Sequence, residues 1–391
     1  MSWDKIAFSE LVEFPPKISL EKDELYDNIP MDVVDGGIKY VQEINQRVYT
    51  GGGAKFGNGD TIFARITPCL ENGKIAKIKG LEKEVGFGST EFFVFRAKEN
   101  ISDPDFIYYL AKTDLVRQPA IRSMVGASGR QRADKGVVEQ IIVPNIPLIT
   151  QRKIASILSV YDDLIENNLK RIKLLEEKAF LRYKGIVRSE KELKMLPLAQ
   201  LAIVTSSKRI FLSDYVEDGI PFYRSKEIIA KSNFESIDKP LYITEERYSD
   251  IKKKFGVPVS GDLLITSVGT IGFIHLVNDD DGDFYFKDGN LIWIKDLNQP
   301  NLAYFLFFKF RTPEFKRMLN SIAIGSSQKA LTIETVKKIE IEIPSDESLI
   351  EFNQETKTII KFIYNLQKQN TKLREARDIL LPRLMSGEIE V

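Results

Sequence analysis

The sequence has few of the side chains that most often carry enzyme chemistry. Its 391 residues include one cysteine, Cys69, and one histidine, His275. A single cysteine excludes an internal disulfide and a thiolate metal cluster, and a single histidine excludes a metal site built from two histidines and a carboxylate. Because His275 lies in an apolar run that predicts a strand, we expect it to be structural or on the surface rather than a metal ligand.

Long apolar runs are also missing. The longest dense stretch, residues 302–310, has nine residues and includes Lys309, whereas a membrane-spanning helix needs about 20. The first residues, Met1 to Asp4, hold no basic segment followed by an apolar one, which is the pattern of a signal peptide. We therefore expect a cytoplasmic protein that does not bind a membrane.

Neither sign of charge is in excess. The 56 Lys and Arg residues balance 56 Asp and Glu residues, whereas a protein that binds nucleic acid by itself is usually basic. This balance slightly favours a protein-binding scaffold. It does not exclude a nucleic-acid binder whose partners supply part of the phosphate contacts.

The motifs of an adenine methyltransferase are absent as well. Residues 14–17 lack the polar lead residue and the aromatic residue of its catalytic segment, and residues 51–55 lack the spacing and the Lys-Ser or Lys-Thr pair of a phosphate-binding loop. Carboxylates are abundant, but no spacing among them singles out a metal site. We therefore expect a non-catalytic chain that needs neither a metal nor a cofactor.

What the sequence does contain is an internal repeat of about 200 residues. Its landmarks recur at offsets of 199, 199 and 202 residues. They are the Gly/Ser loops that begin at Gly126 and Gly325, the apolar runs 93–95 and 292–294, and the Gly-Asp pairs at 59–60 and 261–262. Solenoids and propellers repeat every 20–50 residues or so, so this longer period indicates a duplicated domain-plus-helix unit. Two tandem copies can face an approximately two-fold target, such as duplex DNA with two half-sites.

The repeat divides the chain into four segments. Residues 1–148 and 191–345 hold strand-like runs separated by Gly and Asn, followed by a short helix, which is typical of mixed α/β domains. We predict strands at 61–64, 74–78, 91–95, 261–266, 272–277 and 291–294, and helices at 104–112 and 303–310. The charged runs 252–254 and 279–281 occur only in the second domain, where we expect them in loops.

Residues 149–190 and 346–391 each predict one long helix. The first is expected to run from a capping Thr150 to about Lys184, and the second to end near 382–387, where Pro and Gly are stop signals. In both, apolar residues recur at alternating steps of four and three, interrupted by a single Asn that fixes register at a cost in stability. The predicted seam residues are Ile154, Leu158, Tyr161, Ile165, Asn168, Ile172, Leu175, Ile359, Ile363, Leu366, Asn370, Leu373 and Leu380.

These seams predict that the two helices pack on each other as an antiparallel coiled coil. About 35 residues make a rod of roughly 50 Å. The alternative is a pair of ordinary amphipathic helices, each docked on its own domain. The predicted fold class is therefore α+β: two tandem α/β domains joined by two long helices.

The two long helical segments carry distinctive motifs, which are residues 147–158 (PLITQRKIASIL) with 162–168 (DDLIENN), and residues 373–389 (LREARDILLPRLMSGEI). These motifs resemble, respectively, the central conserved region and the C-terminal conserved helix of a known family, the specificity subunits of type I restriction–modification systems. The Gly-Asp strand and the Gly/Ser loop also occur in both halves where the family has them, so the resemblance covers nearly the whole chain.

The resemblance implies two target-recognition domains, 1–148 and 191–345, each reading one half of a bipartite double-stranded DNA target. It implies that the central helix 149–190 and the C-terminal helix 346–391 set the spacer and dock two methyltransferase subunits. Restriction/translocase subunits would complete the complex. Recognition domains differ greatly between members, so no base-reading residue is carried over from the family and the target sequence is not predicted.

Candidate DNA contacts come from the residues themselves. Glycines let the backbone approach a phosphate, and Arg and Gln can make bidentate contacts with bases or phosphates. The candidates are Arg65, Thr67, Ser128, Arg130, Gln131, Arg132, Tyr223, Arg224, Lys226, Ser267, Thr270, Ser326, Ser327, Gln328 and Lys329. Each also has a plain structural alternative, which is a solvated turn, a hairpin turn or a solvated charged surface. The lysine run 252–254 is a weaker candidate of the same kind.

Two hypotheses of different classes therefore stand. The first is a DNA sequence-specificity subunit, which predicts that DNA methylation by another protein depends on this chain. The second is a non-catalytic coiled-coil adaptor or scaffold with two protein-binding domains. The adaptor predicts no effect on methylation and no salt-sensitive DNA binding.

Overall fold

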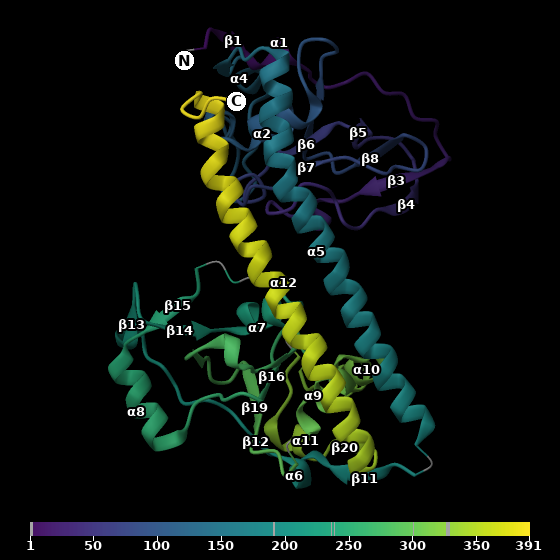
Figure 1. The fold of residues 1–391 in the computed structure, drawn as a ribbon, viewed down its shortest axis with the longest axis vertical. Helices are drawn as coiled ribbons and strands as arrows, with labels where there is room; N and C mark the ends of the chain where they lie inside the picture. Colours follow the sequence, from purple (N-terminus) through teal and green to yellow (C-terminus); the bar gives the residue numbers. More distant parts are fainter. Residues whose placement is uncertain (1–2, 191, 236, 238, 300, 326–328) are drawn as a thin grey trace. The chain divides into compact units, whose positions relative to one another are not determined.

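The computed structural model describes residues 3–190, 192–235, 237, 239–299, 301–325 and 329–391. The chain forms two compact units: unit 1 is Met1–Asn168 with Asn370–Val391, and unit 2 is Leu169–Gln369. The long helices α5 (Leu148–Ser189) and α12 (Asp346–Ser386) each contribute one part to both units (Figure 1). The fold is α+β, as predicted.

Unit 1 is built around antiparallel strands in the order β2-β9-β6-β7. A second sheet has the order β4-β3-β8-β5, with β3 and β8 parallel, and β1 pairs with β10. The strands are β1 (Lys5–Ala7), β2 (Val12–Glu13), β3 (Leu25–Ile29), β4 (Asn45–Val48), β5 (Ala54–Gly57), β6 (Thr61–Ala64), β7 (Ile75–Lys77), β8 (Val85–Gly88), β9 (Phe92–Ala97) and β10 (Ile142–Pro144).

Unit 1 also contains several helices, of which α2 packs on the first sheet. Besides the first part of α5 and the last part of α12, they are α1 (Phe8–Leu11), the 3-10 helix η1 (Met31–Val33), α2 (Pro104–Lys112), α3 (Asp114–Arg122) and α4 (Lys135–Glu139). Helix α2 begins where Asp103 accepts hydrogen bonds from the N–H groups of Asp105 and Phe106, with Pro104 in the first turn. Its buried face packs against Phe63 and Phe95 of the sheet in one core.

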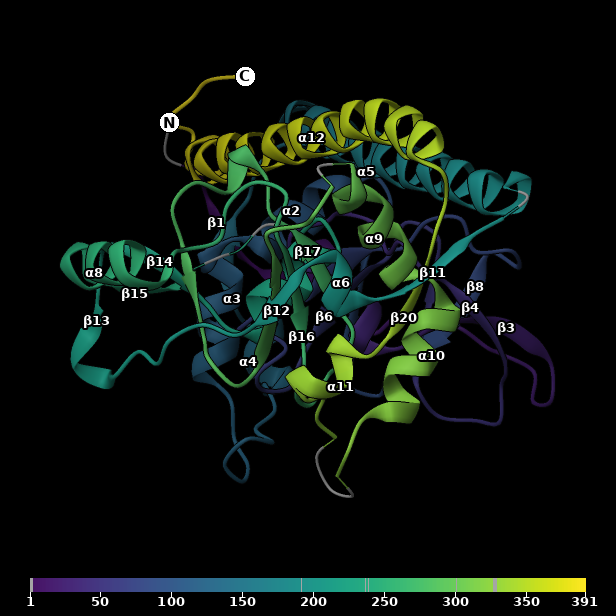
Figure 2. The same ribbon diagram turned by 90° about the horizontal axis from the view of Figure 1, so that it is seen from below.

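Unit 2 repeats this frame. Its first sheet, β12-β19-β16-β17, is again antiparallel, its second has the order β13-β15-β14-β18, and β11 pairs with β20 (Figure 2). The strands are β11 (Lys194–Pro197), β12 (Ile203–Thr205), β13 (Tyr215–Val216), β14 (Ile220–Tyr223), β15 (Leu241–Ile243), β16 (Leu263–Thr266), β17 (Ile274–Leu276), β18 (Tyr285–Phe286), β19 (Leu291–Lys295) and β20 (Glu340–Ile343). The helices are α6 (Leu198–Leu201), η2 (Leu212–Asp214), α7 (Ser225–Ser232), α8 (Glu245–Phe255), η3 (Asp279–Asp281), α9 (Leu302–Arg311), α10 (Pro313–Ile322) and α11 (Ile333–Lys337).

The register of the two frames gives a residue-by-residue correspondence. Phe63 lies opposite Phe93 in unit 1, and Ile265 lies opposite Ile292 in unit 2. After the central strand, the N–H of Arg65 donates to the carbonyl of Glu91 at 2.9 Å. The N–H of Ser267 makes the equivalent bond to the carbonyl of Asn290, also at 2.9 Å. The internal repeat predicted from the sequence is thus a repeat of backbone structure.

The predicted start of the first long helix was wrong. Helix α5 begins at Leu148, and the N–H groups of Thr150 and Gln151 both donate to the carbonyl of Pro147, so Thr150 lies inside the first turn rather than capping it. The predicted end of the second long helix is confirmed: α12 ends at Ser386, and it continues past Pro382 because Leu384 and Met385 pack in the unit 1 core. The turn residue is Gly387, which has a φ of +74°.

The lysine run 252–254 also lies elsewhere than expected. It forms the last turn of α8 rather than a loop, and Thr244 caps the other end of that helix. Lysines in a last turn interact favourably with the helix dipole, which gives this run a structural role. The acidic run 279–281 forms the 3-10 helix η3.

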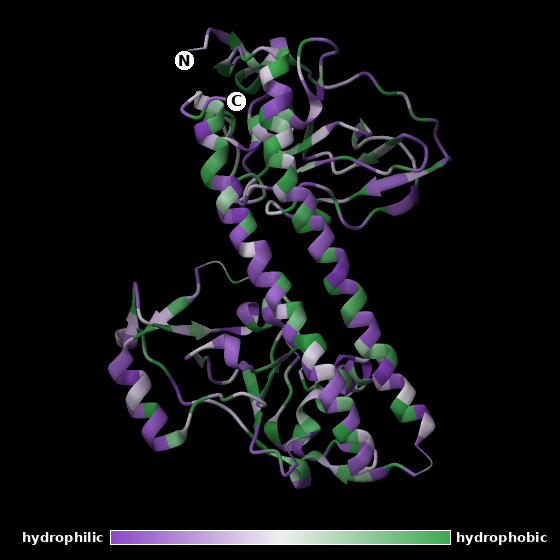
Figure 3. Ribbon diagram, viewed as in Figure 1, coloured by the Kyte–Doolittle hydropathy of each residue, from purple (hydrophilic) through white to green (hydrophobic). Residues whose placement is uncertain are grey.

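The long helices carry a stripe of buried residues. All the predicted seam residues are buried or half-buried, and Figure 3 shows hydrophobic and hydrophilic residues alternating along both helices. Within unit 1, the side-chain amide of Asn168 donates to Asn370 at 2.9 Å, and both residues are buried. Within unit 2, Arg182 forms ion pairs with Glu351 and Glu355.

A buried ion pair joins α5 to α12 in unit 1. Arg377 is 2% exposed, and its Nη1 donates to Oδ1 of Asp162 at 2.5 Å. The hydroxyl of Tyr109 in α2 donates to Oδ2 of the same carboxylate at 2.5 Å. Burial, and then the adjacent Asp162 carboxylate, raise the pKa of Tyr109 well above its ordinary value, so the hydroxyl stays protonated and donates.

We predict that Arg377→Met destabilises unit 1 by about 3–5 kcal/mol, because it leaves the Asp162 charge buried without its cation. Adding Asp162→Asn should recover more than half of the loss, since the amide oxygen still accepts from Tyr109 and no charge is left buried. Hydrogen exchange of the α2 amides measures the opening of unit 1. A double variant as unstable as the single one would show that the charge of Asp162 does not cause the loss.

The Gly-Asp position differs between the two frames. Asp60 in unit 1 makes two hydrogen bonds of 2.7 Å with Arg96. Asp262 in unit 2 instead accepts from the Trp293 indole at 2.8 Å and from the Val259 N–H at 3.0 Å. Burial raises the pKa of Asp262 to about 6.

The raised pKa of Asp262 gives unit 2 a pH-dependent stability. The folded state binds the proton more tightly than the unfolded chain, so this contribution is complete below about pH 4 and is lost as the pH rises to about 6. We predict that Asp262→Asn stabilises unit 2 by about 1–3 kcal/mol at pH 7.5 and removes this pH dependence. The matched variant Asp60→Asn should destabilise unit 1 instead, because Arg96 loses its partner. Thermal unfolding at pH 4, 6 and 7.5 measures both, and equal effects of the two variants would contradict the assignment.

Candidate nucleic-acid interface

In unit 1, two of the predicted contact segments lie side by side. Residues 65–67 follow β6, and the Gly/Ser loop 126–132 follows α3. The N–H of Thr67 donates to the carbonyl of Gln131 at 2.9 Å, and the N–H of Gln131 donates to Oγ1 of Thr67 at 3.1 Å. Arg132 makes single β-bridges with Ile66 and Val125. Four candidates far apart in sequence, Arg65, Thr67, Gln131 and Arg132, are therefore held in one cluster.

Unit 2 makes the same connection with different residues. The N–H of Gly269 donates to the carbonyl of Lys329 at 3.2 Å, and the N–H of Leu331 donates to the carbonyl of Ser267 at 2.7 Å. Ala330 makes single bridges with Val268 and Ile324. Thr270 and Lys329 are exposed beside this junction. The candidates Ser326, Ser327 and Gln328 lie outside the described residues.

Glycines shape these loops. Gly126 and Gly129 have φ values of +132° and +76°, and Gly269 and Gly325 have values of +75° and +115°. L-residues rarely adopt such conformations. A Cβ on Gly126 would also lie 3.1 Å from the carbonyl oxygen of Arg130. The turns in loop 126–132 leave Ser128 and Arg130 exposed.

The cluster of unit 1 carries more positive than negative charge. Arg132 donates to Glu91 from Nε at 2.9 Å and from Nη2 at 2.6 Å. This hydrogen bonding holds the pKa of Glu91 below its ordinary value. Nε of Arg65 lies 3.7 Å from the same carboxylate, and its guanidinium lies 5.0 Å from the centre of the Phe93 ring. One carboxylate thus serves two arginines, and Arg132 keeps 44% of its side chain exposed.

Several predicted contact residues are not available at the surface. Tyr223 is 6% exposed and its ring stacks on Phe284, whereas Ser267 is 2% exposed. Thr67 is 9% exposed and is used by the loop itself. A strand alternates its side chains between two faces, and a polar cluster in the sequence does not show which face is solvated. Tyr223 and Ser267 are therefore too buried to contact a base.

The neighbouring candidates of unit 2 are mixed. The guanidinium of Arg224 donates to Glu227 at 2.8 Å at the beginning of α7. Lys226 has 66% of its side chain exposed. Arg224 therefore helps to hold α7, whereas the Nζ of Lys226 lies 3.4 Å from Glu227 while most of its side chain is exposed.

Two lysines and a phenylalanine that were not predicted from the sequence lie beside this cluster. Lys55, Lys135 and Phe14 line a cavity together with Arg65. The only signal for Lys135 was its position three residues after Arg132, and none marked Lys55 or Phe14. These residues come together through sheet pairing and the helix α4.

The lone histidine lies in the core of unit 2. His275 is fully buried, and its Nε2 lies 2.8 Å from Oδ2 of Asp281. Burial lowers the pKa of His275 below its ordinary value. In the described part of the chain, no His, Cys, Asp and Glu side chains gather in a group of three or more that could hold a metal ion. A search of the same residues found no helix of the length and apolarity that a membrane span requires.

Comparisons with known proteins identify this arrangement. The putative type I restriction enzyme specificity subunit S.HindORF215P of Haemophilus influenzae is 25% identical over 320 residues, which is 80% of this chain and 77% of that protein. The type I restriction enzyme MjaVIII specificity subunit of Methanocaldococcus jannaschii is 22% identical over 333 residues, covering 78% of this chain and 75% of that protein.

A solved structure shares the fold. The S subunit of a type I restriction-modification system from M. genitalium aligns with a TM-score of 0.56 at 16% identity, over 98% of this chain and 96% of that one. The family described as "Type I restriction modification DNA specificity domain" matches the chain twice, at residues 2–177 and 190–382. These two matches include nearly all of both duplicated frames, and the chain belongs to this family.

Proposed function

We propose that this chain is the DNA sequence-specificity subunit of a type I restriction–modification complex, in which each unit reads one half of a bipartite double-stranded DNA target. Two family matches and the names of the relatives support this role. The predicted recognition domains are 1–148 and 191–345. The observation that carries the proposal is the loop junction found at the same place in both frames.

The two junctions share backbone bonds but not side chains. Thr67 and Gly269 occupy the same position, because each donates its N–H to the opposite loop. Gln131 corresponds to Lys329, and Arg132 corresponds to Ala330. A constant frame that presents variable side chains suits two modules that read different sequences. In each half we propose the exposed residues as contacts: Ser128, Arg130 and Arg132 in the first, and Lys226, Thr270 and Lys329 in the second.

We propose that α5 and α12 form an antiparallel coiled coil that sets the spacer between the half-sites. Contacts within each unit support the antiparallel direction. Asp162 meets Arg377 and Asn168 meets Asn370 in unit 1, and Arg182 meets Glu351 and Glu355 in unit 2. Along these contacts the residue numbers of α5 increase while those of their partners on α12 decrease, which is the order of an antiparallel pair. The buried Asn pair would fix the register.

The outer face of α5 supports docking of a further protein. Ile157, Val160 and Leu164 are 38%, 56% and 46% exposed and lie on one face of the helix at steps of three and four. Clustered apolar residues on a surface mark an interaction site. We propose that two methyltransferase subunits bind the helical segments 149–190 and 346–391, and that restriction/translocase subunits join them. The chain itself would be non-catalytic and would need no cofactor.

The first test is modified-base sequencing of a methylation-free host that carries the cognate methyltransferase gene, with and without this chain. We predict chain-dependent methylation at two short specific blocks around a fixed non-specific gap. Co-purification of the two proteins is the control for expression and assembly. An assembled, soluble pair that produces no chain-dependent methylation would contradict the specificity role and favour an adaptor.

A second test assigns the two modules to the two blocks. We predict that Arg130→Ala weakens discrimination in one block of the target only, by about 1–3 kcal/mol if the side chain reads a base. Lys329→Ala, at the matching loop of unit 2, is the paired variant and should affect the other block only. The readout is the methylation rate on duplexes with single base changes in each block. If both variants act on the same block, the proposal of one module per half-site is wrong.

A further inference from the structure

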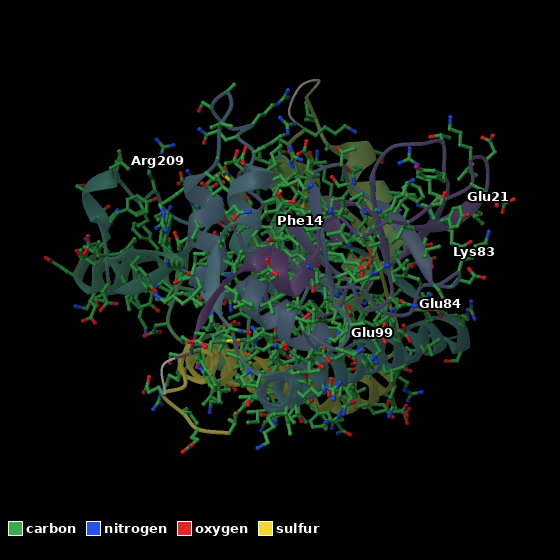
Figure 4. The ribbon with its side chains drawn as sticks, turned by 90° about the horizontal axis from the view of Figure 1, so that it is seen from above. Phe14, Glu21, Lys83, Glu84, Glu99 and Arg209 are labelled. Carbon is green, nitrogen blue, oxygen red and sulfur yellow. The ribbon has the colours of Figure 1, made fainter. Side chains whose placement is uncertain are left out.

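Unit 1 contains a cavity of about 450 Å³ beside the loop junction. Among its lining residues are Phe14 after β2, Lys55 on β5, Arg65 after β6, Phe93 on β9 and Lys135 at the beginning of α4. These residues come from five elements spread over about 120 positions of the sequence. Figure 4 shows Phe14 seen from above.

Three cationic residues, Lys55, Arg65 and Lys135, line this cavity. The Nζ of Lys135 lies 5.3 Å from the centre of the Phe14 ring, and the guanidinium of Arg65 lies 5.0 Å from that of Phe93. Lys135 and Arg65 keep 47% and 34% of their side chains exposed. Two carboxylates lie close to these cations, Glu91 near Arg65 at 3.7 Å and Glu139 near Lys135 at 3.2 Å. Glu91 already accepts two hydrogen bonds from Arg132, so it does not fully balance the charge of Arg65. The cavity therefore keeps an excess of positive charge.

The second frame shows that the fold does not require this set of side chains. Arg65 corresponds to Ser267, and Glu91 corresponds to Asn290, by the shared backbone bond. Lys135 corresponds to Ile333, since each follows the capping residue of the equivalent short helix.

The rings are replaced in the same way. Phe93 corresponds to Ile292 and Phe14 to Val204, by strand register. The positions of Arg65, Lys135, Phe93 and Phe14 therefore hold neutral, non-aromatic residues in unit 2. Replacement of all four indicates that these residues act together in something other than folding.

We propose that this cavity binds a phosphate group of the DNA backbone and so anchors unit 1 on its half-site. The inference rests on the proposed function and adds a site that unit 2 does not share. The charge requires an anion, and the neighbouring exposed Arg130 and Arg132 extend the positive surface along the loop. A cation lies close to each of the two phenyl rings, so the rings do not offer open faces on which a base could stack. Charge is therefore the main attraction of the cavity for a ligand. Phosphate contacts position a protein on duplex DNA, whereas base contacts give sequence specificity.

The test is the salt dependence of DNA binding by the complex of the full chain with its methyltransferase. The variants are Lys135→Ile and Arg65→Ser, which are the residues that unit 2 carries at the same positions and which its frame accommodates. The control is Lys83→Ile. Lys83 has the same 47% side-chain exposure as Lys135 and pairs with Glu24 at 3.0 Å. Figure 4 shows it at the edge of unit 1, away from Phe14.

We expect the double variant Arg65→Ser with Lys135→Ile to lower the slope of log K against log salt by about 0.9, the value for one phosphate. If the double variant and the wild type bind equally at 1 M salt, the double variant then binds about eight-fold more weakly than the wild type at 0.1 M salt. The methylated sequence should stay the same, and Lys83→Ile should keep the wild-type slope. Thermal unfolding of each complex confirms that the variants are folded.

The outcomes separate this proposal from the proposed function. A wild-type complex without sequence-specific DNA binding would overturn both. Wild-type binding together with an unchanged slope in the double variant would overturn only the phosphate site. A change in the methylated sequence, with no change in slope, would also overturn it, because the cavity would then read bases.

Discussion

The buried carboxylate of Asp162 is the constraint on which unit 1 depends. Inside the core this carboxylate needs a cation and hydrogen-bond donors. Arg377 of α12 and Tyr109 of α2 both donate to it. A few residues away, Lys39 donates to Ser159 of α5 and pairs with Asp105 of α2. These directional bonds fix the rotation of α5, α12 and α2 about their axes, which apolar packing alone specifies less sharply. Helix α2 in turn packs on β6 and β9 in the shared core.

This placement positions the candidate interface. Arg65 is attached directly to the end of β6. Loop 126–132 returns from α3, and the next residue, Ala133, donates its N–H to the carbonyl of Arg65. Strand β6, which is part of the core, therefore positions the inner residues of the interface. The glycine turns of the loop position its outer residues. Such a division lets reading side chains change without disturbing the sheet, and the matching junction of unit 2 illustrates it with Gly269 and Ala330.

The two frames also differ in how they balance charge. At the Gly-Asp position, Asp60 of unit 1 pairs with Arg96, whereas Asp262 of unit 2 accepts a hydrogen bond from Trp293 and burial raises its pKa. Beside the loop junction, unit 1 gathers cations and phenyl rings where unit 2 has Ser267, Ile333 and Ile292. Duplication has thus kept the backbone hydrogen bonds and changed the side chains. This is the pattern expected if two equivalent modules recognise different halves of one target.

The sequence by itself determined the repeat, the α+β class, the two long helices and most strands, because periodicity and glycine punctuation are local properties. Tertiary structure decided where helices end: burial of Leu384 and Met385 carries α12 through Pro382. It also decided which candidates are exposed, since Tyr223 turns inward while Arg130 turns outward. The cluster of Arg65 with Arg132, and the cavity formed with Phe14, Lys55 and Lys135, arise from pairing between distant strands and loops. Such pairing depends on long-range register, which no local pattern specifies.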